Sequence, residues 1–243
     1  MRASLTRSGC HDRTTGRFLS HRCSHSSSAV SERDNSPTSS LAPWTIWARR
    51  LSEPARPPRT VLDTDVVFSR VLHELLGRIA AELRMLTLIW SNELISEIER
   101  VLIERKPMSP EAARRWAGYL RDAFPDERVD VTRLPPDVDL GQLTRDPGDE
   151  HVCALAIAGR ADLLLTMDRG YLAPGLREHG IDVRKPDEFL TDVFVEEPVA
   201  VLDALRAQAD VWGGGRPLEA LLDALDRAQA NGFAARARAM LAS

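Results

Sequence analysis

The sequence has little of what marks a secreted or membrane-embedded protein. Its three cysteines, Cys10, Cys23 and Cys153, form no CxxC pair, and an odd number argues against a framework of disulfides. No apolar run approaches the roughly 18–20 residues that a membrane-spanning helix needs. These absences predict a soluble protein in a reducing compartment, with no membrane association.

The common signatures of nucleotide-binding and hydrolytic enzymes are also missing. The chain has no Walker phosphate-binding loop, no GxGxxG fingerprint and no convincing set of Ser, His and Asp or of Cys and His. Lysine is scarce, since only Lys106 and Lys185 occur. The chemistry is therefore to be sought among the carboxylates.

Charge is distributed unevenly along the chain. Residues 1–59 carry ten Arg, no Lys and four acids, whereas acids outnumber basic residues in the remainder. An acidic body does not suit tight, purely electrostatic binding of nucleic acid. It does suit a carboxylate-lined cation site or a basic partner.

Residues 1–58 are rich in Ser, Arg, Thr and Pro and show little apolar periodicity. Such a segment buries too little surface to offset the entropy of ordering. We expect it to be disordered, or to precede the true start of the protein because of a mis-assigned start codon. Its Cys and His residues match no spacing typical of a zinc site.

Residues 59–192 alternate short apolar runs with helical periodicity. Strands are expected at TVLDT (60–64), LTLIW (86–90), VDVT (129–132), DLLLT (162–166) and IDVR (181–184). Helices are expected over 68–83, after Ser91, after Ser109, over 146–161 and near PDEFL (186–190). This alternation predicts an α/β fold whose central parallel sheet is flanked by helices on both faces.

Residues 193–243 have a different character from the body. They are rich in Ala and Leu, and predict a C-terminal extension of two or three amphipathic helices broken at GGG (213–215) and NG (231–232). No catalytic motif occurs in this region. We expect it to pack on the body or on a partner.

Four acids stand out in four separate elements: Asp63, Glu97, Asp149 and Asp168. Asp63 and Asp168 lie at or just past the carboxyl ends of expected strands, where parallel sheets bind ligands. Converging carboxylates are what Mg²⁺ or Mn²⁺ requires. Such ions can activate water and stabilise in-line attack on a phosphodiester.

Each of these acids also has an ordinary structural explanation. Asp146 could cap the helix that follows, with Asp149 merely favoured by the helix dipole. Glu97 borders an apolar stripe, where exposed Glu is common, and Asp168 could be a turn residue. Asp63 is the hardest to explain this way, because it interrupts a strand that should be buried. On the helix of Asp149, His151 and Cys153 are expected to be structural.

Four stretches, in this order and at this spacing, resemble the PIN domain, and more narrowly the VapC-type toxins of bacterial toxin–antitoxin pairs. They are VLDTDVVFS (61–69), WSNELISEIERVL (90–102), DPGDEHVCALAIAGRADLLLTMD (146–168) and GIDVRKPDEFL (180–190). The resemblance covers about 59–192, and the tail resembles the helical extension of one VapC subgroup. It implies a PIN-like α/β fold with a small C-terminal helical extension.

The resemblance further implies an Mg²⁺- or Mn²⁺-dependent ribonuclease. The family's four metal-binding acids fall on Asp63, Glu97, Asp149 and Asp168, and a water activated by the metal would attack the phosphorus to leave a 5′-phosphate and a 3′-hydroxyl. Thr166 matches a hydroxyl often found before the last acid. A residue commonly Asn in the family is here Asp65, which alters the metal site or takes over the structural hydrogen bonds of that Asn.

The resemblance also implies partners and a location. The expected partners are an RNA substrate, a cognate antitoxin with an Arg-rich segment, and a second copy of the chain in a homodimer. The expected location is the prokaryotic cytoplasm. Arg145 and Arg169, which lie near the motifs, are candidate contacts to the RNA.

Two other functions fit parts of the sequence. VLDTDVV (61–67) also matches the opening motif of haloacid dehalogenase-type phosphatases, in which Asp63 would be the nucleophile and Asp65 its acid/base partner. The other motifs of that class are not evident around the two lysines. The second alternative is a PIN-like fold that acts only by binding a partner.

Overall fold

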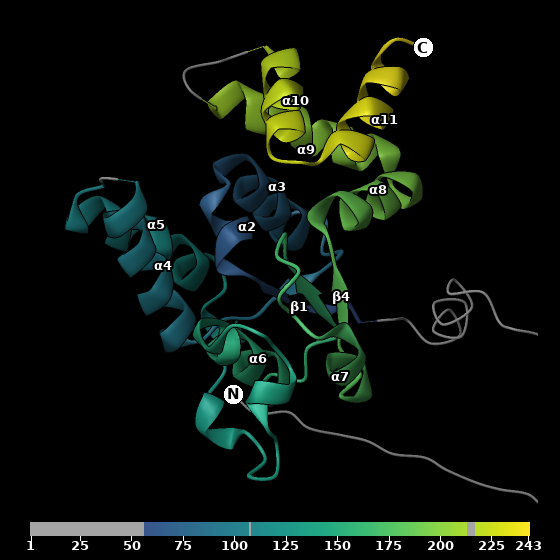
Figure 1. The fold of residues 1–243 in the computed structure, drawn as a ribbon. Coiled ribbons are helices and arrows are strands. Elements are labelled where there is room, and N and C mark those ends of the chain that lie inside the picture. Colours follow the sequence, from purple (N-terminus) through teal and green to yellow (C-terminus); the bar gives the residue numbers. More distant parts are fainter. Residues whose placement is uncertain (1–55, 107, 213–216) are drawn as a thin grey trace, which may run out of the picture. The chain divides into compact units, whose positions relative to one another are not determined.

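The structure is a computed structural model that describes residues 56–106, 108–212 and 217–243. The expected disordered segment, apart from 56–58, lies outside the described residues. So do its cysteines and histidines and the GGG at 213–215. Figure 1 shows the elements in sequence colours.

Four parallel strands form the central sheet in the order β2-β1-β3-β4. They are β1 (Arg59–Leu62), β2 (Thr87–Leu88), β3 (Leu163–Leu165) and β4 (Asp182–Arg184). Thr60 of β1 pairs with Leu88 on one side and Leu163 on the other, so β1 is an inner strand. Val61, Leu62 and all of β3 are buried. The expected parallel sheet is confirmed, and burial on both faces explains why the inner strand β3 is a continuous apolar run.

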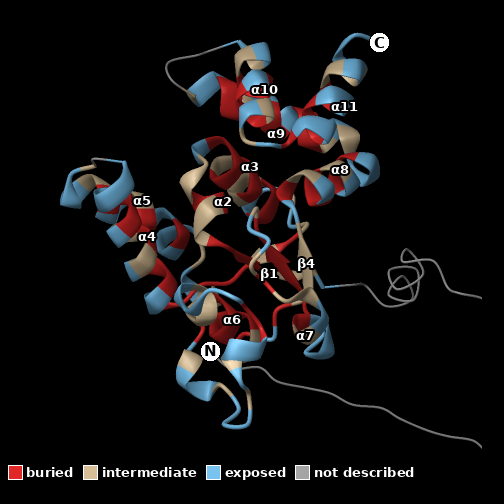
Figure 2. Ribbon diagram, viewed as in Figure 1, coloured by how far each residue is buried: buried red, intermediate tan, exposed pale blue. Residues whose placement is uncertain are grey.

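Helices cover both faces of this sheet. Figure 1 shows α2 (Thr64–Phe68) and α3 (Arg70–Ala81) on one side, and α6 (Glu150–Ala158) and α7 (Ala173–Glu178) on the other. Buried residues lie where these helices meet the strands (Figure 2). The middle of α6, residues 152–156, is buried and none of its residues is exposed, as expected from its almost wholly apolar sequence.

The helix expected over 68–83 is α3 in the structure, and a short helix that was not expected, α2, precedes it. Ser69 has φ −78° and ψ 99°, which ends α2 and begins α3. The short α2 begins directly after Asp63, whose carboxylate accepts a hydrogen bond from Thr64 N at 2.7 Å. The start of α2 therefore places Asp63 at the N-cap of this helix and Asp65 in its first turn.

The next two helices, α4 (Asn92–Arg105) and α5 (Pro110–Ala123), pack against each other beside the sheet (Figure 1). Ser91 Oγ accepts from Leu94 N at 3.3 Å, and Ser109 Oγ accepts from Ala112 N at the same distance. Both expected N-caps are confirmed, because each hydroxyl satisfies an amide that has no partner within the helix.

The strand expected at 129–132 is wrong. Arg128 forms only an isolated bridge with Trp90, and residues Val131–Arg133 are a 3₁₀ turn, η2. Asp130 accepts from Thr132 N at 3.1 Å and from Thr132 Oγ1 at 2.7 Å. This side-chain capping competes with strand pairing. The other 3₁₀ turns are η1 (Pro125–Glu127), η3 (Leu140–Gln142) and η4 (Pro147–Asp149).

The C-terminal region is helical, as expected. Its helices are α8 (Pro186–Glu196), α9 (Pro198–Val211), α10 (Leu218–Arg227) and α11 (Asn231–Leu241). The helical region is interrupted at 228–230, directly before the NG at 231–232, which begins α11. The rings of Phe194 and Phe233 meet edge to face at 5.8 Å, and Gln208 Nε2 donates to Val71 O at 3.1 Å. The extension thus packs on itself and on α3 of the body.

Among the helices of the described segments, none has the length and apolar character to cross a bilayer.

Candidate active site

The carboxyl edge of the sheet brings polar side chains together at the ends of its two inner strands. Asp63 follows β1 and Thr166 follows β3, and these strands pair in parallel. Thr166 Oγ1 donates to Asp63 Oδ2 at 2.6 Å. Asp63 N also donates to Leu165 O at 3.0 Å. The segments that follow β1 and β3 are therefore hydrogen-bonded to each other where they leave the sheet.

Asp63 is a buried carboxylate with only 5% of its surface exposed. Burial raises its pKa, because low-dielectric surroundings disfavour the charged form. The hydrogen bonds from Thr166 and Thr64 oppose this rise, and the charge of Asp168 adds to it. Among the described residues, no Lys or Arg forms an ion pair with this carboxylate.

Asp149 lies in the same electrostatic field. It precedes α6 but makes no capping bond, since Asp146 caps the preceding turn by accepting from Gly148 N at 2.8 Å. Asp149 Oδ2 is instead buried without a hydrogen-bond partner among the described residues. Burial, and then the charges of Asp63, Asp146, Asp168 and Glu97, raise the pKa of Asp149 to about 6. The carboxylate is turned inward, away from an ordinary capping role.

Asp168 is an exposed turn residue that also faces this field. Its Oδ1 accepts from Arg169 N at 2.5 Å and from Gly170 N at 3.0 Å. Thr166 Oγ1 accepts from Asp168 N at 2.9 Å. The turn interpretation and a ligand role are therefore compatible, because Oδ2 is left outside the turn's hydrogen bonds.

Asp65 ties α2 to the segment after β3. Its Oδ2 accepts from Met167 N at 3.0 Å, while Oδ1 is buried without a partner among the described residues. Burial, and then the charge of Asp63, raise the pKa of Asp65 to about 7. A residue that is partly neutral near pH 7 and accepts a backbone hydrogen bond resembles an Asn in its behaviour. This favours a structural role for Asp65.

Glu97, on α4, is oriented differently from the other three acids. It forms a two-pronged ion pair with Arg100, with nitrogen–oxygen distances of 2.8 and 3.0 Å. Its charge still contributes to the raised pKa of Asp149. The structure brings Glu97 within electrostatic reach of the cluster but leaves its carboxylate on an arginine.

Tyr171 is a site residue that sequence reasoning missed. It is buried, and its hydroxyl has no well-formed hydrogen bond among the described residues. Burial and the charges of Asp63 and Asp149 raise its pKa above the ordinary value. An isolated bridge to Thr144 holds it there. A lone Tyr after a turn has no periodicity to mark it, and only its place three residues past Asp168 could have drawn notice.

Two residues of α6 belong to the packing around the site. Cys153 is fully buried, and burial followed by the charge of Asp149 raises its thiol pKa to about 12. His151 Nδ1 lies 2.8 Å from Gly148 O, and its Nε2 is buried without a partner among the described residues. These contacts fit the structural roles expected for both.

The donor chemistry fits a hard divalent cation, although the side chains are not gathered around a single point. Within the described ranges, no group of three or more His, Cys, Asp or Glu side chains is close enough to hold a metal ion. The buried Asp149 Oδ2 without a partner, and the mutual charge repulsion among the acids, are the features that a bound cation would relieve.

Comparison with known proteins supplies independent evidence. Residues 59–170 match the family model described as the PIN domain. The match supports PIN domain family membership for this segment, and the four-stranded parallel sheet with flanking helices is consistent with a PIN-like fold. PIN domains are generally nucleases that use divalent metal ions, so the match indicates a nuclease-type function. No curated protein and no solved structure matches the chain.

Proposed function

We propose that this protein is an Mg²⁺- or Mn²⁺-dependent endoribonuclease and the toxin of a toxin–antitoxin pair. The observation that carries the nuclease proposal is the buried, unpartnered Oδ2 of Asp149 beside the buried Asp63. Carboxylates that repel one another in a buried site are costly to a fold unless something compensates them. The PIN domain match over 59–170 supports the same chemistry.

In this proposal Asp63, Glu97, Asp149 and Asp168 hold one or two cations. A bound Mg²⁺ or Mn²⁺ would lower the pKa of a water and stabilise the charge that develops on the phosphate. Thr166 orients Asp63 through their 2.6 Å hydrogen bond and fixes the Asp168 backbone. Tyr171 and the β3–α2 link through Asp65 shape the wall of the site.

Arg145 and Arg169 are the proposed RNA contacts at this edge. Both are exposed, and neither forms an ion pair with another described residue. Arg145 N donates to Gly170 O at 3.0 Å, which keeps the two segments side by side. Two free guanidinium groups beside an acidic site could bind the phosphates on either side of the scissile bond.

The toxin role and the partners rest on the motifs VLDTDVVFS and DPGDEHVCALAIAGRADLLLTMD, which resemble VapC-type toxins. A cognate antitoxin would place a basic segment over the acid cluster, where it would offset the same repulsion as a cation. A homodimer is proposed on the same resemblance.

Cleavage of structured RNAs with Mg²⁺, Mn²⁺ or EDTA tests the enzymatic proposal. We expect Asp63→Asn and Asp149→Asn each to lower the rate at least about a hundredfold, because each removes a charge from the cation site. Asp139→Asn is the matched control. The Asp139 carboxylate caps η3 by accepting from Gly141 N, as the Asp63 carboxylate caps α2, but Asp139 is exposed. The control should cleave like the wild type.

Three other results would each contradict part of the proposal. Cleavage that persists in both variants would indicate contamination or another site. Equal cleavage in EDTA would rule out a required metal. Folded protein that neither cleaves nor binds Mn²⁺ by calorimetry would support the binding-module alternative. The toxin role is tested by inducing the wild type and Asp149→Asn in a bacterial host, where only the wild type should arrest growth.

A further inference from the structure

An arginine-lined cavity of about 500 Å³ lies at the opposite edge of the sheet from the acid cluster. Its walls include Arg59, the first residue of β1, Thr87, the first residue of β2, and the end of α6 at 158–160. Asp63 of the acid cluster directly follows the carboxyl end of β1. β1 spans the distance between the two edges, roughly 10 Å for its three residue steps. The cavity is therefore separate from the proposed active site.

The lining carries a positive excess in an otherwise acidic body. Arg56, Arg59, Arg128, Arg133 and Arg160 face two lining acids, Glu127 and Asp130. Asp162 adds a third acid nearby, paired with Arg56 at 3.1 Å. Arg128 and Arg160 form no ion pair within the described residues. A positive hollow in an acidic protein concentrates anions locally.

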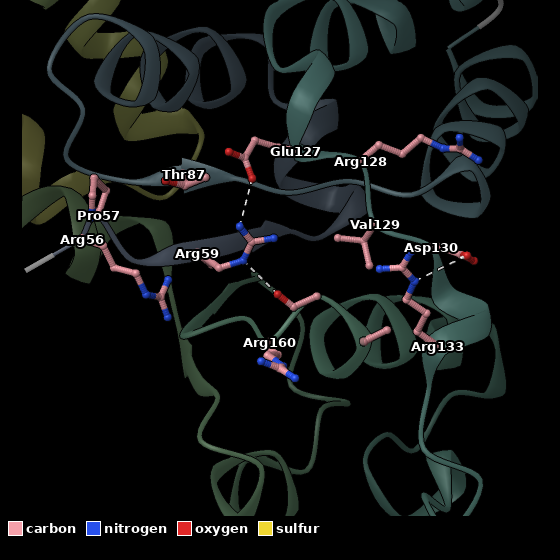
Figure 3. Close-up of a pocket in the computed structure, with 12 residues that line it drawn as sticks. Arg56, Pro57, Arg59, Thr87, Glu127, Arg128, Val129, Asp130, Arg133 and Arg160 are labelled. Carbon is pink, nitrogen blue, oxygen red and sulfur yellow. Dashed lines mark hydrogen bonds and ion pairs between the residues drawn. The ribbon is translucent and has the colours of Figure 1, made fainter.

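Arg59 is held in place for binding. Its Nε donates to Gly159 O at 2.9 Å and its Nη1 to Glu127 at 3.0 Å, which leaves Nη2 without a hydrogen bond among the described residues. Figure 3 shows the Arg59 and Arg133 guanidinium groups on either side of Val129, with Arg128 extending away from them. Arg133 is 81% exposed and lies 3.8 Å from Asp130, a loose pair. A guanidinium held by two hydrogen bonds and a highly exposed guanidinium thus flank the Val129 side chain.

Arg160 is the most informative residue of the cavity. It has φ +49°, in the left-handed region where glycine is normally preferred at a helix end. Its backbone N–H donates a hydrogen bond to Ile157 O at 3.0 Å, and the N–H of Ala161 donates to Ala156 O at 2.8 Å. This is the pattern of a Schellman motif. The glycine lies one residue earlier, because a Cβ on Gly159 would come within 2.6 Å of the Ile89 side chain. The chain therefore holds an arginine in a strained backbone position at the cavity wall.

We propose that this cavity binds the phosphate group of a nucleotide, either free or as part of an RNA strand. Planar guanidinium groups from separate segments can each donate paired hydrogen bonds to phosphate oxygens. A phosphate offers more acceptor oxygens than a carboxylate, so it can be shared among Arg59, Arg133 and Arg160. The volume leaves room for a sugar against Val129 and Pro57. The cavity has no aromatic side chain to stack a base, so phosphate recognition is expected to dominate.

The test measures binding by the full chain in EDTA, where metal-dependent cleavage cannot occur. The probes are inorganic phosphate, adenosine 5′-monophosphate, a fluorescent single-stranded RNA and poly-glutamate. We expect Arg160→Gly and Arg133→Ala each to weaken binding of a phosphate probe about tenfold. Arg114→Ala, an exposed arginine on α5, is the matched control and should bind like the wild type. For RNA, each cavity variant should reduce the dependence of log K on log salt by about 0.7.

Folding and binding are separated by the same variants. Arg160→Gly relieves the positive φ and should raise the melting temperature by about 2–4 °C while weakening binding. Loss of phosphate and nucleotide binding supports a site for free nucleotides, and loss of RNA binding alone supports an RNA strand. Unchanged binding in both variants, no binding of any phosphate probe, or binding of poly-glutamate alone would overturn the proposal. None of these results depends on whether the protein cleaves RNA.

Discussion

Thr166 and Asp63 lie 103 residues apart in sequence, and the side-chain hydroxyl of one donates to the carboxylate of the other at 2.6 Å. The Thr166 Oγ1 atom, which is the donor in that bond, also accepts a hydrogen bond from Asp168 N at 2.9 Å. One threonine hydroxyl thus connects the end of β1 to the turn after β3. Because this bond favours the charged form of Asp63, it partly offsets the rise in pKa that burial causes.

Thr166→Val should therefore weaken the site without changing its charge. The substitution leaves the Asp63 carboxylate buried with one fewer donor, at a cost of about 1–3 kcal/mol to the free energy of unfolding. It should raise the pKa of Asp63 further and lower both Mn²⁺ affinity and cleavage about 10- to 100-fold. Calorimetry with Mn²⁺ and RNA cleavage measure these effects. Thr166→Ser keeps the hydroxyl and should restore most of the activity, whereas equal loss in both variants would point to packing alone.

Asp65→Asn separates a nuclease from a phosphatase that uses Asp63 and Asp65 as a pair. An Asn carbonyl oxygen can accept from Met167 N as Asp65 now does at 3.0 Å. Nuclease activity should stay within about threefold of the wild type, whereas a phosphatase would lose its acid/base group. Cleavage of RNA and of a generic phosphomonoester, assayed side by side, distinguishes the two.

The same substitution should change how stability depends on pH. The folded pKa of Asp65 is raised to about 7, so its ionised form is disfavoured by folding. In metal-free protein, its contribution to stability should fall as the pH rises from about 4 to about 7. Asp65→Asn removes this loss and should raise the free energy of unfolding at pH 8 by about 1–2 kcal/mol, after allowance for partial exposure. Urea unfolding in EDTA at pH 5 and pH 8 measures it; no gain at pH 8 would contradict it.

Arg100→Ala should release Glu97 for the cation site. The ion pair that now holds Glu97 has an Arg100 side chain that is 54% exposed, so it contributes little to folding. Without it, Mn²⁺ affinity should rise about two- to fivefold, while the stability of the fold should change little, because exposed ion pairs contribute little to folding. Titration calorimetry provides the measurement. Arg114→Ala removes a similar exposed pair on α5 and serves as control; weaker Mn²⁺ binding by Arg100→Ala would show that the arginine supports the site.

What sequence reasoning captured depends on local chemistry. The caps at Ser91 and Ser109 could be recognised because a hydroxyl before an apolar helix has one evident partner. The position of Asp63 at the carboxyl end of β1 followed from the apolar run before it. The parallel sheet followed from alternation of strands and helices, since such connections need a crossover.

What it missed depends on particular side-chain interactions and on pairing between distant segments. The strand expected at 129–132 was overridden by Asp130, whose carboxylate binds Thr132 instead of leaving the backbone free to pair. The orientation of Glu97 was set by its ion pair with Arg100, three residues further along the same helix, which competes with the other acids for this carboxylate. Tyr171 was missed because its role depends on a bridge to Thr144. In each case, the deciding contact is a side-chain interaction or a long-range pairing.

His73 should make the protein sensitive to acid, independently of the acid cluster. It is buried in α3 with its ring 5.5 Å from that of Trp116, and burial lowers its pKa to about 4 although Glu74 opposes the shift. An unfolded His titrates near 6.5, so the unfolded chain binds the proton first as the pH falls. The contribution of neutral His73 to the free energy of unfolding is fully present above about pH 6.5. It decreases by up to about 3 kcal/mol as the pH falls towards 4. Urea unfolding at pH 7 and pH 4.5 should show a smaller difference for His73→Phe, which keeps a ring against Trp116, than for the wild type. An NMR titration that places the pKa of His73 near 6.5 would contradict this account.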